Sequence, residues 1–141
     1  MAAVVAVAVN RRTGEIKVER VCVAHDCGQR INPDGTVNQF EGGVIQTVSR
    51  TLMEQVTWDR TKVLSRDWVS YPILRHDQVP KVLVDLMDQL GQLSWGAGEL
   101  TACAIPAAIR TAVFDATGAR LRAVLFTQQQ VLAALGQPVA A

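Results

Sequence analysis

The sequence lacks the features that mark secreted or membrane-spanning proteins. It has only three cysteines, Cys22, Cys27 and Cys103. An odd number of cysteines without a secretory signal favours free thiols over a disulfide framework. The apolar opening, residues 1–9, is far shorter than the roughly 20 residues that cross a bilayer, and we interpret it as a strand. We therefore expect a cytoplasmic protein without a membrane span.

An excess of charge of one sign is also lacking. The chain has 14 basic and 13 acidic residues, which gives a formal net charge of +1. Because a phosphate backbone attracts a strongly basic surface, nucleic acid is not an expected partner. Apolar residues make up 49% of the sequence and charged residues 19%, as in globular proteins with a core. Without repeats or a long linker, residues 1–141 are predicted to form one α+β unit.

Several motifs of catalysis and metal binding are missing. No GxSxG motif, phosphate-binding P-loop or complete dinucleotide fingerprint occurs. Cys22, His25, Asp26 and Cys27 lie close together, but their spacing matches no usual zinc pattern. We favour a strand end in which His25 and Asp26 make structural hydrogen bonds. His76 is predicted to lie in a surface loop.

The hydrophobic pattern of the first third predicts a β-hairpin and a long helix. Two β-rich runs flank residues 10–15, where Gly14 can supply the positive φ of a turn. Pro33 and Gly35 then break the pattern. Apolar residues at helical spacing follow and predict a helix over residues 36–55.

The middle of the chain predicts short strands, and a second helix follows them. Runs rich in β-branched residues between 56 and 88 are separated by polar or proline-containing breaks, and 81–87 is one such run. Pro106 suits the first turn of the next helix and Gly118 suits its end.

The C-terminal stretch predicts a short helix with signals at both ends. Thr127 is the expected N-cap, and Gln130 is its partner in a capping box. Gly136 and Pro138 are the expected stop. Because the first strand starts at Met1 without a lead-in, we expect an edge of the sheet to need a partner, as in a piece of a larger unit.

The stretch LSWGAGELTACAIPAAI, residues 93–109, contains the most distinctive candidate site. Gly96 and Gly98 let a backbone approach a ligand closely or adopt unusual φ values. Glu99 follows them, ahead of small apolar residues. If Glu99 is buried, desolvation raises its pKa and suits it to act as a general base. The alternative is a carboxylate that caps the following helix, and the residues alone favour capping over catalysis.

Three stretches in fixed order resemble the xanthine dehydrogenase and aldehyde oxidase family of molybdenum hydroxylases. They begin VCVAHDCG at residue 21, DWVSYPIL at residue 67 and WGAGELTA at residue 95. The likeness covers nearly the whole chain. It is strongest to the C-terminal part of the large, molybdopterin-binding subunit in bacterial members of the nicotinate dehydrogenase and isoquinoline 1-oxidoreductase type.

The resemblance implies roles for six residues. Glu99 becomes the general base at the molybdenum centre, which reverses the preference for capping. Gln39 is expected to contact the pterin, because its amide both donates and accepts hydrogen bonds. The glycines expected to give the cofactor room are Gly42, Gly43, Gly96 and Gly98. The family usually has proline after the glutamate, whereas Leu100 follows it here.

The resemblance also implies a cofactor and partners. We expect molybdenum–molybdopterin, in its cytosine dinucleotide form, bound only together with the missing upstream part of the large subunit. Three scattered cysteines cannot form an iron–sulfur module. Electrons would therefore leave through an iron–sulfur small subunit and a flavin or cytochrome subunit. The expected reaction hydroxylates an N-heterocycle or aldehyde with oxygen from water. The alternative is a non-catalytic truncated fragment or interaction module.

Overall fold

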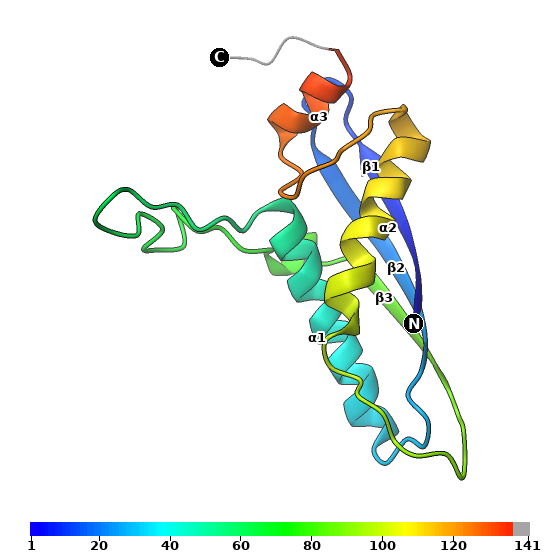
Figure 1. The fold of residues 1–141 in the computed structure, drawn as a ribbon. Coiled ribbons are helices and arrows are strands. Elements are labelled where there is room, and N and C mark those ends of the chain that lie inside the picture. The colour runs from blue at the N-terminus through cyan, green and yellow to red at the C-terminus, as the bar shows by residue number, and fades with distance from the viewer. Residues whose placement is uncertain (137–141) are drawn as a thin grey trace.

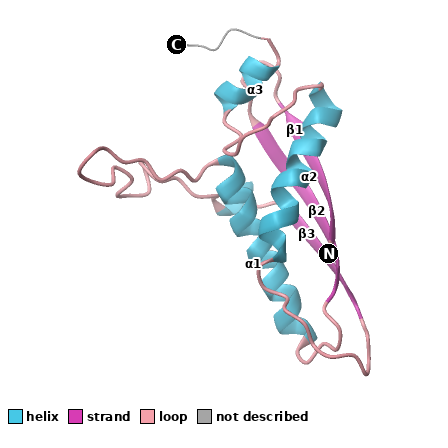
Figure 2. Ribbon diagram, viewed as in Figure 1, coloured by secondary structure: helices cyan, strands magenta, loops and turns pink. Residues whose placement is uncertain are grey.

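The chain folds into a small mixed sheet covered by helices, as a computed structural model of residues 1–136 shows (Figures 1 and 2). The strands are β1 (Ala2–Val9), β2 (Ile16–Asp26) and β3 (Lys81–Met87), and the helices are α1 (Pro33–Leu52), α2 (Leu100–Thr117) and α3 (Gln128–Ala134). The α+β class predicted from the sequence is confirmed. Within residues 1–136, every helix is too short or too polar to span a bilayer.

The sheet has the order β1-β2-β3, with β2 in the centre. β1 and β2 form the predicted antiparallel hairpin, and Gly14 takes a φ of 75° in its turn. The predicted run 81–87 forms β3, which pairs with β2 in parallel. A parallel pair needs a long crossover connection, and the crossover contains α1.

α1 and α2 cover one face of the sheet and build the core (Figures 1 and 2). Each helix presents apolar residues four apart, a spacing that aligns them on one face. The core residues that are almost completely buried are Val21 and Val23 of β2, Phe40, Val44 and Val48 of α1, and Ile105, Ile109 and Val113 of α2.

α1 begins three residues earlier than predicted. The Asn32 side chain accepts a hydrogen bond from the Gly35 amide at 2.9 Å and caps the helix, with Pro33 at its first position. A proline tolerated at this position has no amide that a helix would need. Pro33 and Gly35 therefore belong to the first turn, and the prediction that they break the pattern before the helix was wrong.

α2 also begins earlier than predicted. It starts at Leu100, so Pro106 lies inside the helix rather than in its first turn. Proline has no N–H to donate to the carbonyl four residues before it, here that of Ala102. Burial of the apolar stripe Ile105, Ile109 and Val113 compensates for that loss. Gly118 ends the helix as predicted, with a φ of 77° and its N–H donated to the Phe114 carbonyl at 2.7 Å.

α3 has the predicted N-cap. Thr127 Oγ1 accepts a hydrogen bond from the Gln130 amide at 3.2 Å. Gly136 follows the helix with a φ of 68°. Pro138, the other half of the predicted stop, lies outside the described residues.

The segment between α1 and β3 projects from the body as an arm, drawn at the left of Figure 1. We name residues 54–71 the arm. Tyr71 closes its base by donating a hydrogen bond to Glu54 Oε2 at 2.8 Å. Of the short strands predicted before β3, the described chain contains only an isolated bridge between Trp58 and Val63. That prediction was wrong because the arm has no neighbouring strand with which its β-favouring residues could pair.

The close packing of α1 on α2 gives a prediction with a matched control. A Cβ on Gly43 would lie 2.6 Å from Thr101 Oγ1, whereas a Cβ on Gly42 would have no described atom within 4 Å. We expect Gly43→Ala to lower the free energy of unfolding by about 1–3 kcal/mol through overpacking. Gly42→Ala should raise it by up to about 1 kcal/mol, because alanine favours helix. Urea unfolding of both variants checks this, and equal effects would contradict the assigned contact.

Candidate functional site

A cavity of about 290 Å³ lies between α1 and the start of α2. It brings together five of the six residues that the sequence singled out, and Gly96 is the one outside its lining. The predicted residues in the lining are Gln39, Gly42, Gly43, Gly98 and Glu99. The other lining residues are Asn38, Gln46, Arg50, Thr101 and Ala102.

One face of α1 supplies most of the polar groups of the cavity. Gln46 and Arg50 lie seven and eleven residues after Gln39, so the three align along the helix. Arg50 donates a hydrogen bond to Gln46 Oε1 at 2.9 Å. The prediction from the sequence missed Gln46 and Arg50. Helical spacing from Gln39 could have found both, because it places them two and three turns further along the same face.

The glycines of the site give room in different ways. Gly42 faces open space, and Gly43 is occupied by its contact with Thr101. A Cβ on Gly98 would lie 3.8 Å from Gln39 Nε2, so the glycine loop runs beside the Gln39 amide. Neither Gly96 nor Gly98 has a positive φ. Their role is therefore close approach, not an unusual backbone conformation.

Glu99 occupies the N-cap position of α2 but does not cap the helix. Its φ and ψ of −95° and −5° are helical, and its side chain makes no capping hydrogen bond. The capping alternative is therefore wrong. The carboxylate is exposed, so this chain alone does not provide the burial on which a raised proton affinity would depend.

The turn after β2 holds the loop that leads to Glu99. The Trp95 amide donates to the Cys27 carbonyl at 2.8 Å, and Ser94 Oγ donates to the Gln29 carbonyl at 2.7 Å. Gly28 sits in the middle of this turn with a φ of 71°. A Cβ there would clash with the carbonyl oxygen of Leu93. The loop is thus anchored to residues 27–29 at three consecutive positions.

Asp26 and His25 end β2 in different environments. Asp26 accepts a hydrogen bond from the Gly28 amide at 2.9 Å, which confirms its predicted structural role. His25 is 3% exposed, and its ring lies 4.7 Å from that of Phe40. Neither of its ring nitrogens has a hydrogen-bond partner among the described residues. The predicted hydrogen bonds of His25 were therefore wrong.

Burial lowers the pKa of His25, because a charged imidazolium loses its hydration in the interior. The amino group of Met1 lowers this pKa further, whereas Asp26 and the backbone of Gly96 raise it and only partly offset burial.

The described residues hold no metal site. Cys22, half-buried, and Cys27, buried, are free thiols. Within residues 1–136, no three His, Cys, Asp or Glu side chains cluster closely enough to hold a metal ion. His76 lies exposed in a one-turn 3₁₀ helix, His76–Gln78.

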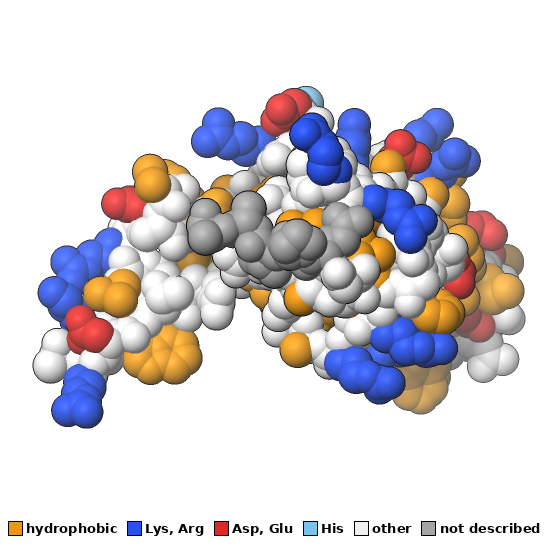
Figure 3. Space-filling model, turned by 90° about the horizontal axis from the view of Figure 1, so that it is seen from above, with side chains coloured by type: hydrophobic (Ala, Val, Ile, Leu, Met, Phe, Trp, Pro, Cys, Tyr) orange, Lys and Arg blue, Asp and Glu red, His pale blue; other side chains and the backbone are white. Residues whose placement is uncertain are grey.

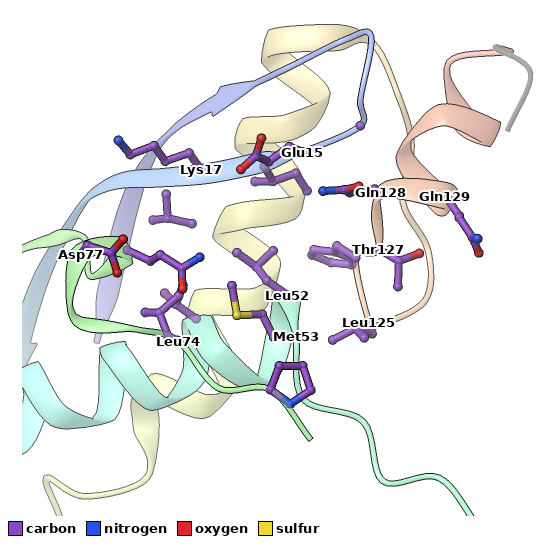
Figure 4. A pocket seen from close by; sticks show the side chains of 17 residues that line it. Glu15, Lys17, Leu52, Met53, Leu74, Asp77, Leu125, Thr127, Gln128 and Gln129 are labelled. Atoms are coloured by element: carbon purple, nitrogen blue, oxygen red, sulfur yellow. The ribbon is translucent and has the colours of Figure 1, made fainter. Parts of the chain in front are cut away.

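A larger cavity of about 810 Å³ lies near the C-terminal end of α1, against β2 and α3 (Figure 4). Leu52, Met53 and Leu74 contribute apolar walls, and Glu15 and Lys17 lie at its β2 side. It contains none of the residues predicted from the sequence. The smaller cavity is the better candidate site, because a carboxylate and several amides converge there.

The fold and the smaller cavity define an α+β unit that presents a polar, amide-lined wall suited to an organic cofactor. The sequence pattern of the molybdopterin cofactor-binding domain matches residues 1–80. A nicotinate dehydrogenase of Pseudomonas putida is 44% identical over 130 residues, which are 92% of this chain and 11% of that protein. The chain belongs to the xanthine dehydrogenase and aldehyde oxidase family, as part of a molybdopterin-binding subunit.

Other relatives agree with this family and also extend far beyond the chain. The isoquinoline 1-oxidoreductase of Brevundimonas diminuta is 36% identical, in its beta subunit, over 115 residues, 82% of this chain and 15% of that protein. The aldehyde oxidoreductase of Desulfovibrio gigas superposes with a TM-score of 0.81 at 27% identity, covering 92% of this chain and 15% of its own. This chain therefore spans less than a fifth of these relatives.

The anchoring of the glycine loop gives a second prediction. Gly28→Ala should lower the free energy of unfolding by about 1–3 kcal/mol, because the new Cβ meets the Leu93 carbonyl. Gly91→Ala is the matched control. Gly91 has a φ of 86°, but a Cβ there would have no described atom within 4 Å, so this variant reports the backbone strain alone. Urea unfolding gives the difference between the variants, and a cost at Gly28 no larger than at Gly91 would contradict the contact.

Proposed function

We propose that this chain forms one wall of the cofactor site in the large subunit of a molybdenum hydroxylase. Glu99 acts as the general base, and Gln39 contacts the pterin. Gly42, Gly43, Gly96 and Gly98 give the cofactor room. The observation that supports this proposal best is the convergence of Gln39 and Glu99, sixty residues apart in sequence, on one cavity.

The side chains of the cavity suit the edge of a pterin. Asn38, Gln39 and Gln46 carry amides that donate and accept hydrogen bonds, as the mixed donor and acceptor edge of a pterin requires. The open space at Gly42 leaves the wall flat. When bound, the cofactor supplies the two-electron oxidation and the site at which water-derived oxygen is activated.

Glu99 is placed for proton transfer. It follows Gly98, which lies beside the Gln39 amide, so the carboxylate and the pterin-contacting residue share one end of the cavity. Its side chain is not engaged by α2 and is available to accept a proton. The exposed carboxylate becomes enclosed only when the opposite wall is present, and enclosure raises its proton affinity toward neutral pH.

The substrate proposed for this site is an N-heterocycle or an aldehyde. Nicotinate, isoquinoline and aldehydes occur in the names of the relatives. We also propose the cytosine dinucleotide form of molybdopterin. An iron–sulfur small subunit, with a flavin or cytochrome subunit, would take the electrons.

The arm supports the proposal that the rest of the large subunit packs against this chain. Trp58, Trp68 and Val69 are 71%, 73% and 90% exposed. The arm carries hydrophobic side chains between charged ones, at the left of Figure 3. Large exposed apolar side chains gathered on one element mark an interaction surface. The remainder of the subunit is the partner we favour, because the relatives are so much longer than this chain.

The outer face of the sheet supplies a second such surface. Val4, Cys22 and Leu83 are aligned across the three strands, on the face opposite to the helices. Val4 is 71% exposed and Leu83 44%. The neighbouring Ala2, Ala6 and Ala24 are small and exposed, so this face is flat enough for close packing of another element.

A chimera tests the role of Glu99. In it, this chain replaces the matched 130 residues of the Pseudomonas putida nicotinate dehydrogenase, and molybdenum content and nicotinate oxidation are measured. Glu99→Gln should keep the metal content and lower turnover by about 10²–10⁴-fold, the usual contribution of a general base. Gln39→Ala should lower the metal content itself.

Glu19→Gln, on the exposed side of β2 and outside the cavity, is the matched control and should change neither quantity. Full turnover in Glu99→Gln would overturn the assigned base. A parent chimera that folds but binds no molybdenum would favour the alternative, a non-catalytic interaction module.

The arm gives a further prediction. Trp58→Ser combined with Trp68→Ser should change the free energy of unfolding of the isolated chain by less than about 0.5 kcal/mol, because both side chains are exposed. In the chimera the same pair should lower the yield of soluble, molybdenum-containing protein several-fold, because a buried contact is lost. Equal effects in the two proteins would contradict docking of the arm on the rest of the subunit.

A further inference from the structure

His25 lies between the two halves of the candidate site. Its ring packs on Phe40, the residue next to Gln39 on α1. On its other side is the backbone of Gly96, three residues before Glu99. A backbone group that raises the pKa of a histidine favours the charged ring, so it is an acceptor, the Gly96 carbonyl. The imidazole therefore touches both the helix and the loop that form the cavity.

The ring is buried without a hydrogen-bond partner of normal geometry in the described chain. A neutral imidazole has one N–H donor and one acceptor nitrogen, and leaving either unsatisfied in the interior is costly. The Gly96 carbonyl is the acceptor at hand. A small movement of the loop toward α1 would complete an N–H···O bond and remove part of that cost.

Few charged groups surround the ring. The amino group of Met1 and the carboxylate of Asp26 act on it. β3 places Leu86 opposite it in register, α1 contributes Phe40, and residues 93–98 of the loop carry no charge. An imidazolium at this position would thus have one nearby anion, Asp26, which also accepts a hydrogen bond from Gly28.

We propose that His25 is a positioning residue for Glu99: its neutral ring donates to the Gly96 carbonyl and holds the loop 93–99 against α1, and protonation of the ring releases the loop. This inference rests on the proposed function only for the role of Glu99. The proton enters from water onto the free ring nitrogen, and no covalent bond changes.

The direction of the pH effect follows from burial. The folded chain holds the pKa of His25 below its ordinary value of 6.5, so the fold prefers the neutral ring. Its contribution to holding the loop is complete above pH 6.5 and is lost as the pH falls below that value toward the lowered pKa.

Trp95 reports on the loop directly, because its amide is bound to the Cys27 carbonyl. Trp58→Phe with Trp68→Phe leaves Trp95 as the only tryptophan. We would follow acrylamide quenching and fluorescence anisotropy of Trp95 in the cofactor-free chain from about pH 8 to about pH 5, the range of histidine titration. Quenching should stay constant above pH 6.5 and rise about twofold below it as the loop opens.

Two matched variants isolate the ring. His25→Phe keeps an aromatic ring against Phe40 and should give a profile without pH dependence. His76→Gln removes the exposed histidine and should leave the profile of the parent unchanged. Persistence of the pH dependence in His25→Phe would overturn the proposal.

An NMR titration of the two imidazoles in the parent chain keeps the test decisive if His25→Phe does not fold. The His25 signal should titrate below pH 6.5, at the same pH as the change in Trp95. Titration of His25 without any change in Trp95 would also overturn the proposal. Since no measurement uses molybdenum or turnover, failure here is distinct from failure of the proposed function.

Discussion

The contact between Gly43 and Thr101 sets the distance between α1 and α2, and the candidate site depends on that distance. No side chain larger than hydrogen fits at Gly43 without displacing Thr101, so the helices approach as closely as their backbones allow. The cavity opens on either side of this contact, with Gln39 and Gln46 on α1 and Glu99 at the start of α2. A wider separation would move the carboxylate away from the amides, whatever the loop did.

Much of the fold could be predicted from local signals. The Gly14 turn, the run 81–87 and the Thr127 cap depend on residues a few positions apart, and all three occur in the structure. The predicted starts of α1 and α2 were wrong, because Pro33 and Pro106 are not the boundaries that their sequence context indicates. A proline is compatible with the first position of a helix, and buried side chains can hold one inside. Tertiary packing decided both cases.

The site shows the same division between local and long-range information. Glu99 and Gln39 could be singled out from their motifs, and helical spacing could have added Gln46 and Arg50. His25 could not be understood this way. Its environment joins the end of β2, a residue of α1 and the backbone of Gly96, three segments far apart in sequence. The failed cap at Glu99 is likewise a matter of backbone geometry, because its φ and ψ are already helical, unlike those of a usual N-cap residue.

The proline inside α2 has a consequence for whatever binds in the cavity. Because Pro106 has no N–H, the carbonyl of Ala102 is not engaged by the usual helical bond from four residues onward, and Ala102 belongs to the cavity wall. An acceptor carried by the main chain of a helix has no rotamers to freeze. Binding to it would therefore cost less conformational entropy than binding to a glutamine or asparagine side chain. A break in the hydrogen bonding of a helix thus gives the wall a rigid recognition group.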